Sequence, residues 1–259
     1  HRMSYTDKIP VIGTATIIDT YWLRRLIASV DYPVESFFII NNGNKEYIEE
    51  LNEIARQKHR YIENFYVTHL PANLGVSGAW NLIIKSFLNA PYWVIVNDDV
   101  SFGSGFLQEM NQAAQVKDIQ MVFGKTGTEG LPSYDLFLIK DWVIQNYGLF
   151  DENFYPAYCE DMDHIMKMVN APFRYIPDLN ATYYHGGSTD YNTTGSQSKK
   201  SDPELRKKIE TAHLLNKQYL VQKWGGGCWQ LHPTATSFEN SEPRPEYDLE
   251  FNRKKYLGF

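Results

Sequence analysis

The first two-thirds of the chain alternates short apolar runs with longer segments whose apolar residues recur at helical spacing. The runs are rich in β-branched and aromatic residues, which predicts strands at residues 11–15, 36–41, 64–68, 92–96 and 120–123. The segments between the first four runs predict helices at 21–29, 46–58 and 77–88. This alternation is typical of βαβ units, so we expect an α/β fold with a mainly parallel sheet flanked by helices.

The strict alternation ends after Gly124, where a loop rich in glycine, threonine and proline begins. The elements predicted beyond it are a strand at 134–139, helices beginning near 141 and 160, and a strand at 173–176. Asp202 and Pro203 form an N-cap and a first-turn proline, which predicts a helix to about Lys223. We expect the polar loop 186–200 to be a mobile lid, and the residues after the glycine run at 225–227 to be irregular.

Net charge and the length of the apolar runs argue against two classes of partner. The formal net charge is -6, which provides no basic field for the phosphates of a nucleic acid. The longest apolar runs are far shorter than the ~20 residues that span a bilayer, so we expect no integral membrane segment. The two cysteines, Cys159 and Cys228, lie in dissimilar contexts and predict no disulfide framework. We therefore expect a soluble, cytoplasmic protein.

Two adjacent carboxylates, Asp98 and Asp99, directly follow the apolar run 92–96. The carboxyl ends of parallel strands form the ligand crevice of open α/β sheets. A hard divalent cation commonly bridges one or two carboxylates to the phosphates of a substrate, which would give this pair a function. The alternative is an aspartate pair that caps a helix or shapes a turn. The motif alone favours neither interpretation.

A second acidic cluster, Glu160, Asp161 and Asp163, stands at the start of a predicted helix. The helix dipole offsets part of the repulsion, so an acidic first turn is the simpler interpretation. The functional alternative is a general base, because transfer of a group to a hydroxyl needs a carboxylate that accepts the proton. His185 lies between an apparent strand and a glycine turn. It is either a structural histidine or a ligand that completes a coordination sphere with Asp99.

Three common motifs are absent. The first predicted strand and its turn, residues 11–16, contain a single glycine, which disfavours a classical dinucleotide-binding loop. The sequence Gly124-Lys125-Thr126 lacks the upstream glycine of a phosphate-binding loop, because Ile119 stands at that position. No G-x-S-x-G sequence supports a hydrolase nucleophile elbow.

An ordered set of short motifs extends from about residue 10 to residue 188. The set consists of Leu26-Ile27-Ala28-Ser29-Val30, Asn41-Asn42-Gly43, Asn73-Leu74-Gly75, Asn97-Asp98-Asp99, Gly148-Leu149-Phe150-Asp151-Glu152, Glu160-Asp161-Met162-Asp163 and His185. No single motif is specific. In this order, however, the set resembles the family-2-like nucleotide-diphospho-sugar glycosyltransferases with the Rossmann-like GT-A fold.

The resemblance implies that residues 1–259 form a single GT-A catalytic domain. Within it we expect an N-terminal segment (1–9), a nucleotide-sugar-binding half (10–124), an acceptor and catalytic half (125–200) and a C-terminal helix and tail (201–259). We interpret His1 and Arg2, which precede Met3, as an expression remnant.

The resemblance also implies which residues bind the donor. Thr14 and Asn41 or Asn42 would contact the nucleotide. Asn73 and Gly75 would lie along the base, the ribose or the phosphates. Asp98 would lie near the ribose or the sugar of the donor.

By the same resemblance, Asp99 is the principal ligand of a Mn²⁺ or Mg²⁺ ion and His185 is a candidate second ligand. Asp161 is the base, with Glu160 beside it. The sequence departs from the family pattern at two positions. Asn41 stands where many relatives have an aspartate that binds the nucleobase, which leaves the base open. Asn97 replaces the first acid of the Asp-x-Asp motif, which puts the strength of metal binding in question.

These residues predict a metal-dependent, inverting, hexosyltransferase-like enzyme. It would move a sugar from a UDP-, GDP- or dTDP-sugar to a hydroxyl of a glycan or glycoconjugate, with the metal stabilising the departing diphosphate. One alternative is a nucleotidyltransferase, for which residues 13–19 lack the expected basic loop. The other is a non-catalytic carbohydrate-binding or nucleotide-binding protein on a GT-A scaffold.

Overall fold

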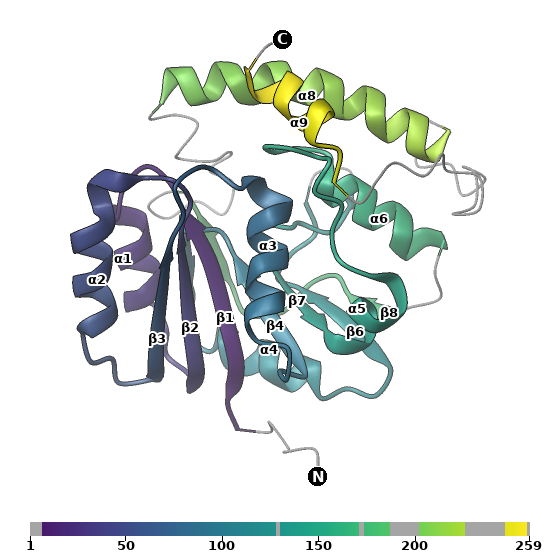
Figure 1. The fold of residues 1–259 in the computed structure, drawn as a ribbon. Helices are drawn as coiled ribbons and strands as arrows, with labels where there is room; N and C mark the ends of the chain where they lie inside the picture. Colours follow the sequence, from purple (N-terminus) through teal and green to yellow (C-terminus); the bar gives the residue numbers. More distant parts are fainter. Residues whose placement is uncertain (1–6, 128–129, 171–173, 187–201, 226–246, 258–259) are drawn as a thin grey trace.

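The computed structural model describes residues 7–127, 130–170, 174–186, 202–225 and 247–257. Its centre is a seven-stranded sheet with the order β3-β2-β1-β4-β7-β6-β8 (Figure 1). The strands are β1 (Ile9–Thr16), β2 (Val34–Asn41), β3 (Ile62–His69), β4 (Tyr92–Val96), β6 (Ile119–Phe123), β7 (Leu136–Lys140) and β8 (Arg174–Ile176). The strands β1 to β4 are parallel, β7 is antiparallel to both neighbours, and β8 is parallel to β6. The predicted mainly parallel sheet is confirmed.

The sheet reverses its strand order between β1 and β4. From β1 the chain proceeds to β2 and β3 on one side, and then returns to place β4 on the other side of β1. Such a switch point leaves a crevice at the carboxyl ends of the two strands, because the connections leave in opposite directions. The residues that follow β1 and β4 therefore face each other across this crevice.

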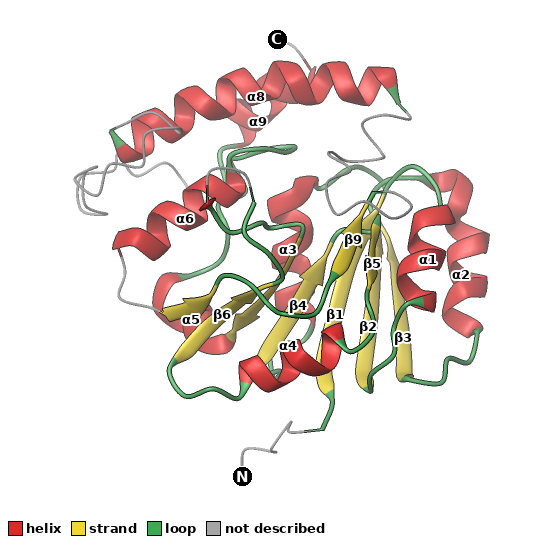
Figure 2. Cartoon of the chain, turned by 180° about the vertical axis from the view of Figure 1, so that it is seen from behind, coloured by secondary structure: helices red, strands yellow, loops and turns green. Residues whose placement is uncertain are grey.

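Alternating residues of the buried strands pack on opposite faces of the sheet, as expected for strands covered on both sides. On one face, Phe37 and Ile39 pack with helices α1 (Tyr21–Ala28), α2 (Ile48–Arg56) and α4 (Phe106–Ala114). On the other face, Phe38 and Ile40 pack with α3 (Gly75–Ser86), α5 (Asp141–Tyr147) and α6 (Glu160–Asn170). Figures 1 and 2 show the two layers from opposite sides.

A short antiparallel ribbon stands beside the main sheet. It is formed by β5 (Val100–Phe102) and β9 (Tyr183–His185), with Val100 paired to His185 (Figure 2). The ribbon joins segments that are more than 80 residues apart in the chain. It brings the end of β9 next to the acidic pair that follows β4.

Two C-terminal helices, α8 (Pro203–Trp224) and α9 (Leu249–Leu257), lie across the carboxyl end of the sheet (Figure 1). Asp202 caps α8 by accepting hydrogen bonds from the backbone amides of Glu204 and Leu205, as its sequence predicts. A third apolar cluster ties α8 to the body of the protein; it contains Phe154, Cys159, Met166, Tyr219, Leu220 and Trp224. Among the described helices, none is long and apolar enough to cross a membrane.

The structure corrects two sequence-based predictions. The tail was predicted to be irregular, but residues 249–257 form α9, with Asp248 accepting a hydrogen bond from the amide of Phe251. This helix has no clear apolar face, so the spacing of its apolar residues does not predict a helix, and contacts with α8 stabilise it instead.

The helix α4, which the sequence analysis did not predict, covers one face of the sheet. The predicted lid lies outside the described residues, except for Gly186.

Candidate functional site

A cavity of about 600 Å³ opens at the carboxyl ends of β1 and β4. Its walls come from both halves of the domain and from the first half of α8, which contributes Leu205, Ile209 and His213. All the predicted site residues except Asn41 line it: Thr14, Asn42, Asn73, Gly75, Asp98, Asp99, Glu160, Asp161 and His185. These predicted residues come from six separate segments of the chain and surround one cavity that is large enough for a small molecule.

Thr14 lies near the end of β1 and is fully buried. Its hydroxyl has no hydrogen-bond partner among the described residues, although buried polar groups are nearly always paired. Because Thr14 lines the cavity, a ligand is the natural partner for this hydroxyl.

Asn42 and Asn73 shape the loop that leads into α3. The Oδ1 of Asn42 accepts a hydrogen bond from the amide of Leu74 at 2.6 Å, and the Oδ1 of Asn73 accepts one from Gly75 at 2.8 Å. Gly75 begins α3 with φ +80°, a conformation that favours glycine. A Cβ atom at this position would lie 2.8 Å from the ring of Tyr155. The loop therefore requires glycine both for its backbone and for the close approach of Tyr155.

Asn41 is the predicted site residue that does not line the cavity. It is 1% exposed, and its Nδ2 donates to the backbone oxygen of Asn44 at 2.6 Å. Its Oδ1 accepts from the amide of Asn44 at 2.9 Å, and Nδ2 also lies 3.1 Å from Nδ1 of His69. The amide of Asn41 therefore shapes the turn after β2, and its contact with a nucleotide stays a prediction.

The two acids after β4, Asp98 and Asp99, lie in different surroundings. Burial and the neighbouring charge of Asp99 raise the pKa of Asp98 to about 8, although a hydrogen bond with Thr16 opposes the rise. At neutral pH Asp98 is therefore largely protonated when no ligand is bound. Asp99 is buried, and its Oδ1 lies 3.2 Å from Nε2 of His185. The backbone pairing of β5 with β9 places these two residues together.

Asp135, which precedes β7, completes this group and was not predicted. Its Oδ2 lies 3.0 Å from Nδ1 of His185, and its Oδ1 accepts hydrogen bonds from Tyr183 and Ser133. Burial lowers the pKa of His185, but Asp135 and Asp99 outweigh it and raise the pKa to about 10. Burial raises the pKa of Asp135, but the contacts with His185 bring it below its ordinary value. The imidazole ring is thus held between two carboxylates.

The spacing of Asp99 and His185 suits a divalent cation. Two ligands about 2.1 Å from a metal, in neighbouring octahedral positions, lie about 3 Å apart. Asp99 Oδ1 and His185 Nε2 are separated by 3.2 Å, and Asp135 orients the ring through its other nitrogen, as is usual for metal-binding histidines. In the part of the chain that the structure describes, no three His, Cys, Asp or Glu side chains form a complete ligand set. Phosphate oxygens and water would have to supply the remaining ligands.

The second pair of acids, Glu160 and Asp161, begins α6. Glu160 is 8% exposed, and its Oε2 has no hydrogen-bond partner among the described residues. Burial, together with the charge of Asp161, raises the pKa of Glu160 well above its ordinary range. Asp161 is more exposed to the cavity, and its Oδ1 accepts a hydrogen bond from the amide of Met162. Burial also raises the pKa of Asp161.

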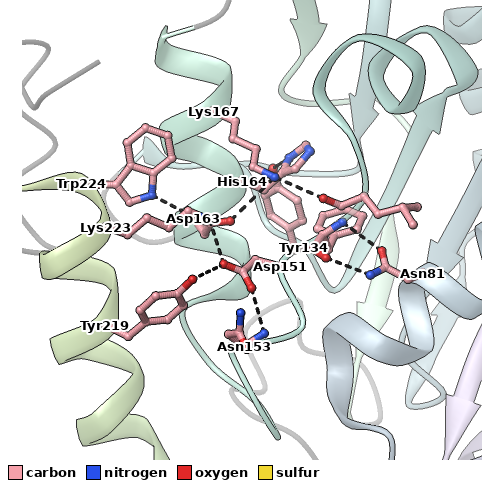
Figure 3. Close-up of polar contacts among 12 residues, drawn as sticks. Asn81, Tyr134, Asp151, Asn153, Asp163, His164, Lys167, Tyr219, Lys223 and Trp224 are labelled. Atoms are coloured by element: carbon pink, nitrogen blue, oxygen red, sulfur yellow. Dashed lines mark hydrogen bonds and ion pairs between the residues drawn. The ribbon is translucent and has the colours of Figure 1, made fainter. Parts of the chain in front are cut away.

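Asp163, the third acid of this cluster, is not among the residues that line the cavity, and its side chain points toward Lys223 and Trp224 of α8 (Figure 3). It is 1% exposed, and its Oδ1 accepts a hydrogen bond from Trp224 Nε1 at 2.9 Å and lies 2.7 Å from Nζ of Lys223. Lys223 also pairs with Asp151 at 2.9 Å. This acid therefore attaches α8 to α6, and the structure separates it from Glu160 and Asp161.

No family model matches the chain. It is 22% identical over 265 residues to a galactofuranosyl glycosyltransferase of Leishmania donovani, an alignment that covers 75% of this chain and 61% of that protein. The chain thus spans less than two-thirds of the length of this curated relative.

Two solved structures have similar folds. S. aureus TarS (residues 1–349) in complex with UDP has a TM-score of 0.55 at 15% identity, covering 80% of this chain and 65% of that one. GalNAc-T7 with UDP, GalNAc and Mn²⁺ has a TM-score of 0.63 at 12% identity, covering 96% of this chain and 54% of that one. The chain therefore has the GT-A fold. The likeness to nucleotide-sugar glycosyltransferases that the sequence motifs indicate is confirmed.

Proposed function

We propose that this protein is a metal-dependent glycosyltransferase that moves a sugar from a nucleoside-diphosphate donor to an acceptor hydroxyl. One observation carries the proposal. One cavity at the switch point of the sheet is lined by the Thr14 hydroxyl, which has no partner among the described residues, by the Asp99–His185 pair and by two carboxyl groups with raised pKa values. Perturbed carboxyl groups that converge on one cavity are typical of active sites.

The donor would lie between the first strand and the loop that begins α3. Thr14, Asn42, Asn73 and Gly75 line this side of the cavity, where the nucleotide would bind. TarS and GalNAc-T7 have both been crystallised with UDP, which makes a UDP-sugar the first donor to test. GDP-sugars and dTDP-sugars are the alternatives, because Asn41 leaves the base open.

Asp99 and His185 would hold a Mn²⁺ or Mg²⁺ ion, which when bound supplies positive charge next to the departing diphosphate. The GalNAc-T7 structure contains Mn²⁺, which favours this ion as the first to test. Asp135 accepts a hydrogen bond from Nδ1–H of His185, which keeps the proton of a neutral imidazole on Nδ1. When the imidazole loses its other proton, from Nε2, the lone pair of Nε2 is free to bind a metal ion beside Asp99. Asp98, which lines the cavity beside this pair, would face the ribose or the sugar.

Asp161 would act as the base. It is the more exposed of the two acids in the cavity, whereas burial and the charge of Asp161 raise the pKa of Glu160 well above its ordinary value. A carboxylate at this position accepts the proton of the acceptor hydroxyl as the hydroxyl attacks the anomeric carbon, and the bond to the diphosphate breaks. A single displacement from the opposite face inverts the anomeric configuration. The raised pKa of Glu160 favours its protonated form, which would donate a hydrogen bond to a substrate oxygen.

A calorimetric titration tests the donor site. UDP, GDP, dTDP and CMP are titrated with and without Mn²⁺ into the wild type, Asp99→Ala and the exposed control Asp118→Asn. We expect one nucleotide to bind tightly only with Mn²⁺, and Asp99→Ala alone to abolish this dependence. If no nucleotide binds to the wild type, the proposal is wrong.

Turnover then separates an enzyme from a binding protein. UDP-sugars, including a galactofuranosyl donor suggested by the name of the curated relative, are incubated with glycan acceptors and the released UDP is measured. We expect turnover by the wild type and Asp118→Asn but not by Asp161→Asn. Nucleotide binding without turnover in any variant would support the binding-protein alternative.

A further inference from the structure

The turn that leads into α6 has an unusual backbone. Tyr158 and Cys159 are consecutive non-glycine residues with φ of 75° and 72°, in the left-handed region. Side-chain-bearing residues rarely adopt this conformation, and two in succession persist only where the surroundings hold them. Glu160 follows at once, and Asp161 is the next residue. The geometry of this turn, residues 155–159, therefore sets where both acids point.

One side of the turn contacts the loop before α3. The hydroxyl of Tyr155 donates to the backbone oxygen of Asn73 at 2.8 Å. The amide of Val76 donates to the backbone oxygen of Pro156 at 2.8 Å. These contacts join the turn to the donor side of the cavity, but they involve its first two residues and not the left-handed pair.

The other side of the turn contacts Asn216 of α8, which is completely buried. Its Nδ2 donates to the backbone oxygens of Ala157 at 3.0 Å and Tyr158 at 3.1 Å, with a longer contact of 3.4 Å to Tyr155. One side-chain amide thus lies against three carbonyl groups of the turn. Because the carbonyl of Tyr158 is in the left-handed pair, Asn216 contacts the strained backbone directly.

Lys255 of α9 fixes the orientation of this amide. Its Nζ donates to Oδ1 of Asn216 at 2.8 Å and also to the backbone oxygen of Asn153. Lys255 is 2% exposed. Since the ammonium group takes the amide oxygen, the amide nitrogen must face the carbonyl groups of the turn.

The helix that carries Asn216 is anchored further along. Tyr219 donates to Asp151 at 2.6 Å, Lys223 pairs with Asp151 and Asp163, and the indole of Trp224 donates to Asp163 (Figure 3). These contacts hold the second half of α8 on α6 and on the segment before the turn. Because α8 is held in place, Asn216 keeps a fixed position beside the turn.

We infer that Asn216 is a positioning residue for Asp161, acting through the backbone of residues 155–159. It lies outside the cavity lining and holds the turn in the conformation that directs the base toward the acceptor. Lys255 keeps the amide of Asn216 in the required orientation. The helices α8 and α9 would thus contribute to catalysis by fixing the position of Asp161. The catalytic part of this inference rests on the proposed function, whereas the structural part does not.

The test compares Asn216→Asp and Asn216→Ala with Thr211→Ala. The aspartate keeps the volume and the contact with Lys255 but removes the N–H donors, and the alanine removes both. Thr211→Ala removes an exposed hydrogen bond of the same helix, to the backbone oxygen of Lys207, and takes no part in the contacts that hold the turn or anchor α8. Hydrogen exchange of a peptide spanning residues 155–163 is measured by mass spectrometry, together with UDP affinity, kcat and donor KM.

In both Asn216 variants we expect the 155–163 peptide to exchange at least tenfold faster, with UDP affinity changed less than twofold. We expect kcat to fall at least tenfold with donor KM nearly unchanged, and Thr211→Ala to resemble the wild type in all of these. If the Asn216 variants do not fold, Lys255→Met, which frees the amide to rotate, is measured for the same changes.

Wild-type exchange of the 155–163 peptide in the variants would overturn the inference. So would faster exchange with unchanged kcat, or an equal loss in Thr211→Ala. If the wild type itself turns over no donor, the proposed function fails, and the exchange measurement still decides whether Asn216 holds the turn.

Discussion

Asp135 and His185 are 50 residues apart in the chain, yet Asp135 Oδ2 lies 3.0 Å from His185 Nδ1. The carboxylate holds the imidazole with its other nitrogen 3.2 Å from Asp99. Removing this hydrogen bond would leave His185, the proposed metal ligand, in place but would free its ring to rotate. Asp135, which also lines the cavity, therefore belongs to the candidate site.

We expect Asp135→Asn to weaken Mn²⁺ binding by about 10–100-fold, the usual effect of losing a partner of a metal-binding histidine. Calorimetric titration of Mn²⁺ in the presence of UDP measures this. The exposed Asp118→Asn should bind Mn²⁺ as the wild type does. Unchanged affinity in Asp135→Asn would contradict the role of Asp135.

The acids at the start of α6 should respond differently to the same substitution. Asp161→Asn should lower turnover about 10²–10⁴-fold, as loss of a general base does, with little effect on stability. Asp163→Asn should instead lower the free energy of unfolding by roughly 1–3 kcal/mol, because it weakens the buried partners of Lys223 and Trp224. Urea denaturation and UDP release measure the two effects. Equal stability losses in both variants would contradict this division.

Gly75→Ala should affect both stability and donor binding. Alanine at φ +80° is strained, and its Cβ would lie 2.8 Å from the Tyr155 ring, so we expect a loss of roughly 1–3 kcal/mol. The matched control is Gly105→Ala, which has φ +74° but open space around its Cβ. It should cost less and leave UDP affinity unchanged. Equal effects of both substitutions would show that contact with Tyr155 is unimportant.

The ion pair of Asp151 predicts a dependence of stability on pH. Burial raises the pKa of Asp151, but Lys223 and the hydrogen bond from Tyr219 outweigh it, so the pKa is lower in the folded protein. The unfolded chain therefore takes up a proton more readily as the pH falls. The contribution of this carboxylate is complete above its unfolded pKa, near 3.9, and is lost as the pH falls through the folded value.

Urea denaturation of the wild type and Asp151→Asn at pH 7 and near pH 3 measures this contribution. We expect the difference in unfolding free energy between the two proteins to shrink at the lower pH. A difference that is the same at both values would mean that Lys223 does not stabilise the ionised form of Asp151.

Local patterns predicted most of the fold because each element of the sheet is encoded in a contiguous segment. The apolar run of β4 predicts a buried strand, and Asp202-Pro203 predicts the start of α8. Both signals can be recognised without the rest of the chain. The helix α9 has no such pattern, and its stability comes from contacts with α8. Its only local signal was Asp248, a capping residue.

The site was predicted less completely. Residues that follow strands, such as Asp99, are placed by the sheet alone, and His185 was a candidate from its position between an apparent strand and a glycine turn. Asp135 was missed because its partner becomes visible only when β9 pairs with β5. Asn216 and Lys255 were missed for a similar reason, since apart from the bond between them their partners are backbone groups, which a sequence pattern of side chains does not reveal.

Contacts of Lys255 with Asn153 and Asn216 span 102 and 39 residues of the chain. Ribosomes deliver the chain from its N-terminus, and folding of the emerged part begins before synthesis ends. The strands and loops that form the proposed donor side therefore emerge early, whereas the residues that support the proposed base, Asn216 and Lys255, emerge after them. The proposed donor site and the proposed base would thus be held in one geometry only after α9 has emerged, and a chain cut before α9 would retain only the donor side.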